Sequence, residues 1–143
     1  MLEERKWTAM GALGKTKAEY LADLEEDGMN LRYVPFARRT RQICLAAVRS
    51  NGLALRYVPP AMRDIVVCLD AVDSDGMALE YVPEPLRERE LCFDAVHSSG
   101  EALQFVPENL RDEGLCAEAL DNCPGAVRDV PDSLKGLFVK KEG

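Results

Sequence analysis

Apolar residues recur along this chain with a period of 24 residues, and inside each unit their spacing is helical. In one unit Leu91, Cys92, Ala95 and Val96 follow the i, i+1, i+4, i+5 pattern of a single helix face. A shorter apolar segment, MALEYV, comes before it and ends at a proline, which cannot continue a hydrogen-bond ladder. The pattern therefore predicts one helix of about 10 residues and one helical turn of about six in every unit.

Five residue classes share this period. They are prolines (Pro35, Pro59, Pro83, Pro107 and Pro131), glycines (Gly28, Gly52, Gly76 and Gly100), cysteines (Cys44, Cys68, Cys92 and Cys116), aromatic residues (Tyr33, Tyr57, Tyr81 and Phe105) and arginines (Arg39, Arg63, Arg87 and Arg111). Lys135 stands at the next position of the arginine series. Thr40 and Asp64 stand where a cap begins the helix. We expect the glycine that follows each helix to adopt the left-handed conformation that closes it.

Two repeat architectures have units of about this length. Leucine-rich repeats need an alternating strand segment, whereas the stretch between Leu86 and Leu91 is Arg-Glu-Arg-Glu and the apolar spacing is helical. A helix this short is marginal alone, so each unit buries its apolar face against its neighbours. The sequence therefore predicts an all-α fold, a short helical-repeat solenoid built from 24-residue units with degenerate terminal caps.

The two ends depart from the repeat. In register, Trp7 stands opposite Leu31, Gly11 replaces the proline and Tyr20 replaces the cysteine, while Pro124 takes the place of a glycine. We predict one structural domain with three parts, and a frayed tail over 140–143. The parts are a degenerate N-terminal capping repeat (1–26), four 24-residue helical repeats (27–122), and a degenerate C-terminal half repeat with the tail (123–143).

The units NGLALRYVPPAMRDIVVCLDAV and SGEALQFVPENLRDEGLCAEAL carry a motif of Gly-x-Ala-Leu-x-aromatic-Val, then Leu-Arg, then an apolar-Ala-Val helix. The motif resembles the tandem repeats of the family called domain of unknown function 4116. The resemblance covers residues 27–122 and implies a helical repeat array with no established activity. It implies no catalytic residue at any position of this sequence.

Charge is unevenly distributed. Residues 1–71 carry a net charge of +2 and residues 72–143 a net charge of −9, and the segment from Gly28 to Arg63 holds seven arginines and no acid. No apolar run approaches the roughly 18 residues of a membrane span, and the N-terminus lacks the apolar stretch of a secretory signal. An odd count of five cysteines argues against a closed disulfide framework. These features predict a cytoplasmic protein that does not bind membranes.

Three groups of residues are candidates for chemistry. The cysteine series lacks the close pairs of a metal site, so we expect reduced, buried core residues, with Cys123 the exposed thiol. His97 has no second histidine or nucleophile motif to work with, so we expect no enzyme, no metal and no cofactor. The aromatic series suits either base stacking or the seam between repeats, and we favour the seam. The repeating arginines are expected to pair with neighbouring acids or helix-end carbonyls.

Arginines that vary between units are the candidates for partner binding: Arg32, Arg38, Arg41, Arg49 and Arg56. Our leading hypothesis is a non-enzymatic protein–protein interaction scaffold that binds a protein with an acidic surface, as a monomer or with weak self-association. The alternative is nucleic-acid engagement, through phosphate binding by the arginines or through mimicry of nucleic acid by the acidic half.

Overall fold

The computed structural model describes residues 15–138, and every regular element in that range is helical. The α-helices are α2 (Lys17–Glu26), α3 (Arg41–Ser50), α4 (Ile65–Ser74), α5 (Arg89–Ser98), α6 (Glu113–Asn122) and α7 (Asp132–Phe138). The six-residue 3₁₀-helices are η1 (Gly28–Tyr33), η3 (Gly52–Tyr57), η5 (Gly76–Tyr81), η7 (Gly100–Phe105) and η9 (Pro124–Asp129). Three-residue 3₁₀-turns follow four of these: η2 (Phe36–Arg38), η4 (Pro60–Met62), η6 (Glu84–Leu86) and η8 (Glu108–Leu110). The predicted helical solenoid is confirmed.

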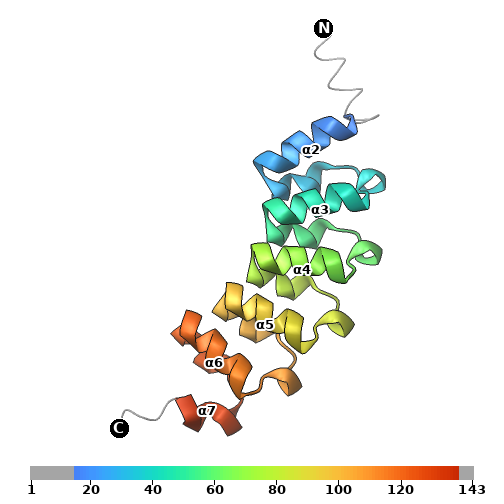
Figure 1. Cartoon of the computed structure of the whole chain (residues 1–143). Coiled ribbons are helices and arrows are strands. Elements are labelled where there is room, and N and C mark those ends of the chain that lie inside the picture. Colours follow the sequence, from blue (N-terminus) through green and yellow to red (C-terminus); the bar gives the residue numbers. More distant parts are fainter. Residues whose placement is uncertain (1–14, 139–143) are drawn as a thin grey trace.

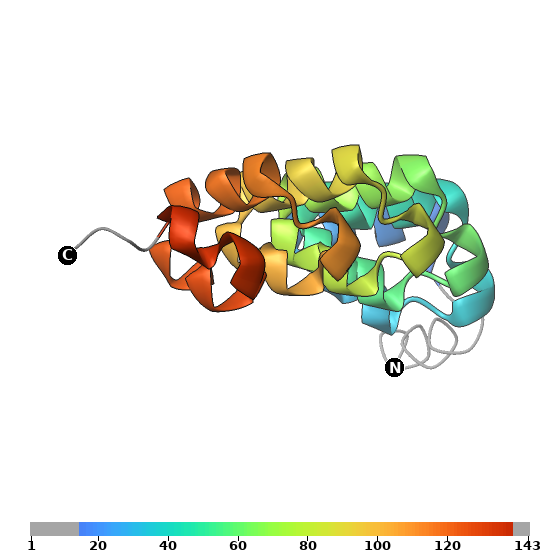
Figure 2. The same cartoon turned by 90° about the horizontal axis from the view of Figure 1, so that it is seen from below.

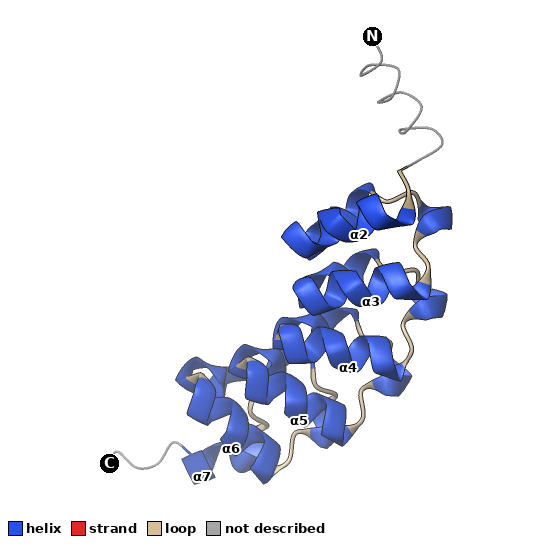
Figure 3. Ribbon diagram, turned by 45° about the horizontal axis from the view of Figure 1, so that its top comes forward, coloured by secondary structure: helices blue, strands red, loops and turns tan. Residues whose placement is uncertain are grey.

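The elements form two layers. Figure 1 shows α2 to α7 stacked one after another, with the six-residue 3₁₀-helices behind them, and Figure 2 gives the same arrangement from below. From α2 to α6 each α-helix packs on the next α-helix, and each six-residue 3₁₀-helix packs on the next one. We call these the α layer (α2–α6) and the turn layer (η1, η3, η5, η7 and η9). The three-residue turns lie along one edge of the stack (Figure 3).

Local sequence explains where the α-helices begin. The side chain of Thr40 accepts a hydrogen bond from the backbone N–H of Ile43, and that of Asp64 accepts one from Val67 at 3.0 Å. Both are the N-caps predicted from the sequence, and each satisfies an N–H that has no partner within its helix. Thr16 and Asp112 cap α2 and α6 in the same way. The three-residue turns, in contrast, were not predicted.

The expected role of the repeat glycines was wrong, because no glycine among residues 15–138 adopts the left-handed region. The residue that closes α4 is instead Asp75, which follows the helix in extended conformation and whose N–H donates to Ala71 O. Gly76 comes next and lies directly against α5, where an added Cβ would be only 2.1 Å from Ala95 O. Its N–H donates to Ser98 Oγ at 3.0 Å. Glycine is therefore required by a close approach between backbones, not by its conformation.

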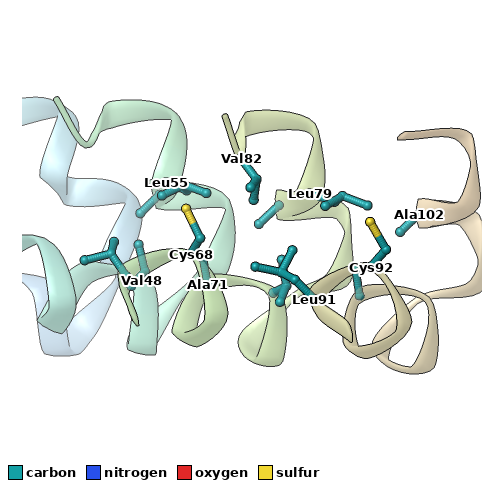
Figure 4. Close-up of a cluster of buried hydrophobic side chains, with 14 of the residues drawn as sticks. Val48, Leu55, Cys68, Ala71, Leu79, Val82, Leu91, Cys92 and Ala102 are labelled. Atoms are coloured by element: carbon teal, nitrogen blue, oxygen red, sulfur yellow. The ribbon is translucent and has the colours of Figure 1, made fainter. Parts of the chain in front are cut away.

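A continuous apolar core fills the space between the layers. In each central unit it takes the alanine, leucine and valine of the turn layer together with four side chains of the α-helix, as Figure 4 shows around Leu79, Leu91 and Cys92. These side chains are at most 2% exposed, and no charged or polar side chain is buried in the described part of the chain. The units 51–74 and 75–98 contribute the full set and the units on either side contribute most of it, so the core extends along the array and is not centred on one point.

The C-terminal end breaks the pattern. The helix α7 begins at Asp132, directly after Pro131, where the earlier units have a three-residue turn. Lys135 therefore lies inside a helix and pairs with Asp132 at 3.3 Å, so it does not continue the arginine series. At the other end Tyr20 is buried in the place of the cysteine. The expectations for Trp7, Gly11 and the tail over 140–143 lie outside the described residues.

Candidate partner-binding surface

The repeating arginines hold the turn layer together. Arg63 donates from Nε to Val58 O at 2.9 Å, from Nη1 to Tyr81 O at 2.9 Å, and from Nη2 to Arg56 O at 3.3 Å. Two of these carbonyls belong to its own unit and one to the next unit. The same three bonds are made by Arg39, Arg87 and Arg111. The planar guanidinium suits this fork of acceptors, so we call the arrangement the arginine clamp.

Of the five candidate arginines, Arg41 and Arg49 lie in the α layer and pair with acids of the next helix. Arg41 Nε lies 3.1 Å from Asp64 Oδ2, and Arg49 Nε lies 2.7 Å from Asp70 Oδ2. Arg41 hydrogen bonding is one cause of the lowered pKa of Asp64, after the bond from Val67 N–H. Their charges are thus already offset within the array.

Arg32 and Arg56 lie in the turn layer, on the opposite side of the core. The guanidinium of Arg32 lies over the ring of Tyr33, 4.8 Å from its centroid. That of Arg56 lies between two rings, 5.2 Å from the centroid of Tyr57 and 5.8 Å from that of Tyr81. Hydrogen bonding to Tyr57 and Tyr33 raises the pKa of Arg32. Both arginines are exposed, and no carboxylate in residues 15–138 lies within ion-pair distance of either.

Arg38 occupies a third place. Its Nη1 donates to the carbonyl of Lys15 at 3.1 Å, and it lines a groove of about 330 Å³ between the beginnings of α2 and α3. Arg41 and Lys17 line the same groove. The structure therefore brings Arg32 and Arg56 together, brings Arg38 close to Arg41, and leaves Arg49 apart from both pairs.

The aromatic series is buried only in part. Tyr57, Tyr81 and Phe105 are partly buried against the core, as the seam interpretation predicted. Tyr33 is 69% exposed, so that interpretation was wrong for the first member of the series. Phe36, which sequence reasoning missed, is 64% exposed and lies near Arg39. Its signal in the sequence is an aromatic residue at a repeat position that elsewhere holds Pro60, Glu84 or Glu108.

The cysteine series is reduced and buried. Cys44, Cys68, Cys92 and Cys116 are free and buried, and Cys123 is free and partly exposed. Burial raises the pKa of the first three thiols to about 11. The thiolate is the reactive form, so burial and pKa act together to suppress reaction.

Thiol labelling tests this arrangement. With a maleimide at pH 7.5, Cys123 should react rapidly and Cys44, Cys68 and Cys92 slowly, at the rate at which the array opens. In the folded state the pKa of each of these three thiols is raised from 9.0 to about 11. The neutral thiols therefore contribute to the free energy of unfolding below pH 9, and this contribution is lost as the pH rises through 11. Urea unfolding at pH 8 and pH 11 measures this loss. Equal labelling rates for all five thiols would contradict a buried series.

His97, the only histidine, is exposed and pairs through Nδ1 with Glu118 of the next helix. It occupies the repeat position of Arg49 and makes an equivalent contact.

Within residues 15–138 no group of three or more histidine, cysteine or acidic side chains is arranged to hold a metal ion. No helix in that range is both long enough and apolar enough to cross a membrane.

The two-layer stack, the clamp and the repeated core define a helical-repeat array. Comparison with known families assigns it further: the model of the family described as Domain of unknown function (DUF4116) matches residues 21–63 and 67–111, more than half of the chain. The chain belongs to this family. Each matched segment contains one whole unit, 27–50 or 75–98, and parts of the units on either side. Searches of curated proteins and of solved structures found no match.

Proposed function

We propose that the chain is a non-enzymatic scaffold that binds another protein through its turn layer. The carrying observation is the pair Arg32 and Arg56, whose exposed guanidiniums lie against tyrosine rings. Among residues 15–138 no carboxylate lies within ion-pair distance of either. Together with Tyr33, Tyr57 and Phe36 they form what we call the arginine–tyrosine surface. Arginine and aromatic residues are the side chains that most often carry binding energy at protein interfaces. The partner is a protein with an acidic surface.

The repeats supply an internal argument for this proposal. Arg32 and Arg56 hold the position that later units fill with Glu80 and Gln104, so the scaffold does not require arginine there. The clamp, which the scaffold does use, takes only the backbone carbonyl of this position. A residue type that varies on a constant backbone is free to serve recognition. We assign the scaffold to the cytoplasm, because free thiols suit a reducing compartment.

A second candidate is single-stranded nucleic acid. The observation that favours it is the exposed ring of Tyr33 beside Arg32, since bases stack on such rings while arginine contacts phosphate. Direct binding of an oligonucleotide, with a steep salt dependence, would support this candidate. Displacement of nucleic acid from another protein without direct binding would instead support mimicry by the acidic half.

Two matched double variants test the protein-binding proposal. Arg32→Gln with Arg56→Gln removes two charges from the turn layer, and Arg41→Gln with Arg49→Gln removes two from the α layer. Capture of partner proteins from a native lysate, and of a labelled oligonucleotide, should be compared with wild type. The first variant should lose capture of its protein partner about tenfold, with a flatter salt dependence, because attraction across an interface steers the encounter. The second should capture as wild type does.

Both variants should stay folded, since exposed ion pairs and exposed cation–π contacts contribute roughly 0–1 kcal/mol each. Equal loss of capture in the two variants would mean that net charge, not the arginine–tyrosine surface, governs binding. Full capture by the folded first variant would overturn the proposal.

A further inference from the structure

Charges are arranged differently in the two layers. In the α layer opposite charges face each other across neighbouring helices, in the pairs Arg41–Asp64, Arg49–Asp70 and Arg89–Asp112. In the turn layer they are sorted along the array. Its first two units present Arg32 and Arg56, and the next two present acids. Sorting leaves η1 and η3 as a cationic half and η5 and η7 as an anionic half, while Arg128 on the last helix, η9, pairs with its neighbour Asp129 at 3.8 Å.

The anionic half consists of exposed carboxylates on η5, η7 and the three-residue turns that follow them. Glu80 and Glu101 lie on the six-residue helices, and Glu84 and Glu108 on the turns. None lies within ion-pair distance of a cation in the part of the chain that the structure describes. Glu80 occupies the repeat position of Arg56, one unit further along. The two halves therefore carry opposite charge on the same backbone geometry.

We propose that the arginine–tyrosine surface binds the anionic half of a second copy of this chain, antiparallel, about a two-fold axis between η3 and η5. The proposal rests on the function proposed above and names the partner. Reversing the direction of one copy places Arg56 of each chain opposite Glu80 of the other, and places Arg32 over the unit that holds Glu101 and Glu108. A two-fold interface uses the same surface on both copies, so it must be complementary to itself. A surface that is cationic in one half and anionic in the other meets that requirement.

Repeat geometry extends the match along the array. Successive units are separated by a helix-packing distance of about 10 Å, and this step is the same in both copies. Once Arg56 faces Glu80, the two-fold axis also brings the unit of Arg32 in each copy to the same side as the unit of Glu101 in the other. A parallel arrangement would place like charges opposite each other. The net charge of −7 repels two copies at long range, so the local pairing must supply the attraction.

Sedimentation velocity over a concentration series tests the proposal with three single variants. Wild type should self-associate at low ionic strength, and salt should weaken the association. Arg56→Glu and Glu80→Arg should each weaken it about tenfold, because every substitution enters a two-fold interface twice. Glu90→Arg is the control, because it makes the same charge change as Glu80→Arg but lies in α5 of the α layer. It should leave self-association at or above the wild-type level.

The decisive sample is an equimolar mixture of Arg56→Glu and Glu80→Arg. The first variant presents carboxylates at both positions and the second presents guanidiniums at both, so a mixed dimer is complementary at every pair. Association that returns in the mixture supports the antiparallel register. A mixture that stays as dissociated as its components overturns it, and so does a wild type that remains monomeric at every concentration.

Two further measurements keep the outcomes separate. Circular dichroism and thermal melting of each variant should match wild type, since the repeat itself accepts either residue at this position. Lysate capture by Arg32→Gln with Arg56→Gln is read independently of sedimentation. If wild type is monomeric and that variant still loses capture, a foreign acidic protein occupies the surface: the self-association is overturned and the proposed function stands. If wild type is monomeric and the double variant keeps full capture, both the self-association and the proposed function are overturned.

Discussion

Gly76→Ala should lower the free energy of unfolding by about 3 kcal/mol, although it adds a single methyl group. An added Cβ would meet Ala95 O at 2.1 Å and the backbone N of Ser99 at 2.9 Å. Both atoms are backbone, so no rotamer change relieves the overlap. Relief requires α5 to move away from the segment that leaves α4, which also strains the bond from Gly76 N–H to Ser98 Oγ. Urea unfolding followed by circular dichroism measures the change.

Gly136→Ala is the matched control, because no atom of residues 15–138 lies within 4 Å of its added Cβ and the residue lies inside α7. Alanine is the better helix former by about 1 kcal/mol, so this variant should be as stable as wild type or slightly more so. A similar loss in both variants would show that Gly76 is required for another reason than the close approach.

Leu91→Ala should cost about 3 kcal/mol. Its side chain is 2% exposed, and α5 packs between α4 and α6, so the cavity weakens contacts with both neighbours. Leu137→Ala, in the terminal helix, removes a side chain that is 55% exposed, and its cost should stay below about 1 kcal/mol. Chemical unfolding of the two variants gives the comparison. Equal costs would contradict an array in which each unit is stabilised by its neighbours.

The sequence predicted the helices because their signals are local. Apolar spacing, the caps Thr40 and Asp64, and the prolines act within one unit, and one unit recurs often enough to exclude coincidence. The role of Gly76 could not be read in this way, since its contact is with Ala95, far along the chain. A glycine after a helix has two explanations, and only the packed neighbour selects between them.

The candidate surface shows the same limit. Arg41 and Arg49 looked like variable, free cations, but the structure pairs them with Asp64, the N-cap of the next helix, and Asp70, which lies on that helix. The acids stand at fixed offsets in the repeat, so comparing adjacent units in register would have suggested both pairs. Tyr33 is more exposed than Tyr57 and Tyr81, because an arginine of the preceding unit contacts each of the latter two. Periodicity alone treats the three residues as equal.

The arginine clamp has a consequence for how such a chain changes length in evolution. It reaches the next unit only through a backbone carbonyl, and a carbonyl is present whatever unit follows. Removal of residues 51–74 would join Ser50 to Asp75 and give Arg39 the carbonyl of Tyr81 in place of that of Tyr57. Arg41 would then face Glu88 and Arg49 would face Asp94, so both ion pairs would keep an acid. Duplication or loss of one whole unit therefore creates no mismatched junction, and the number of repeats can change in a single genetic step.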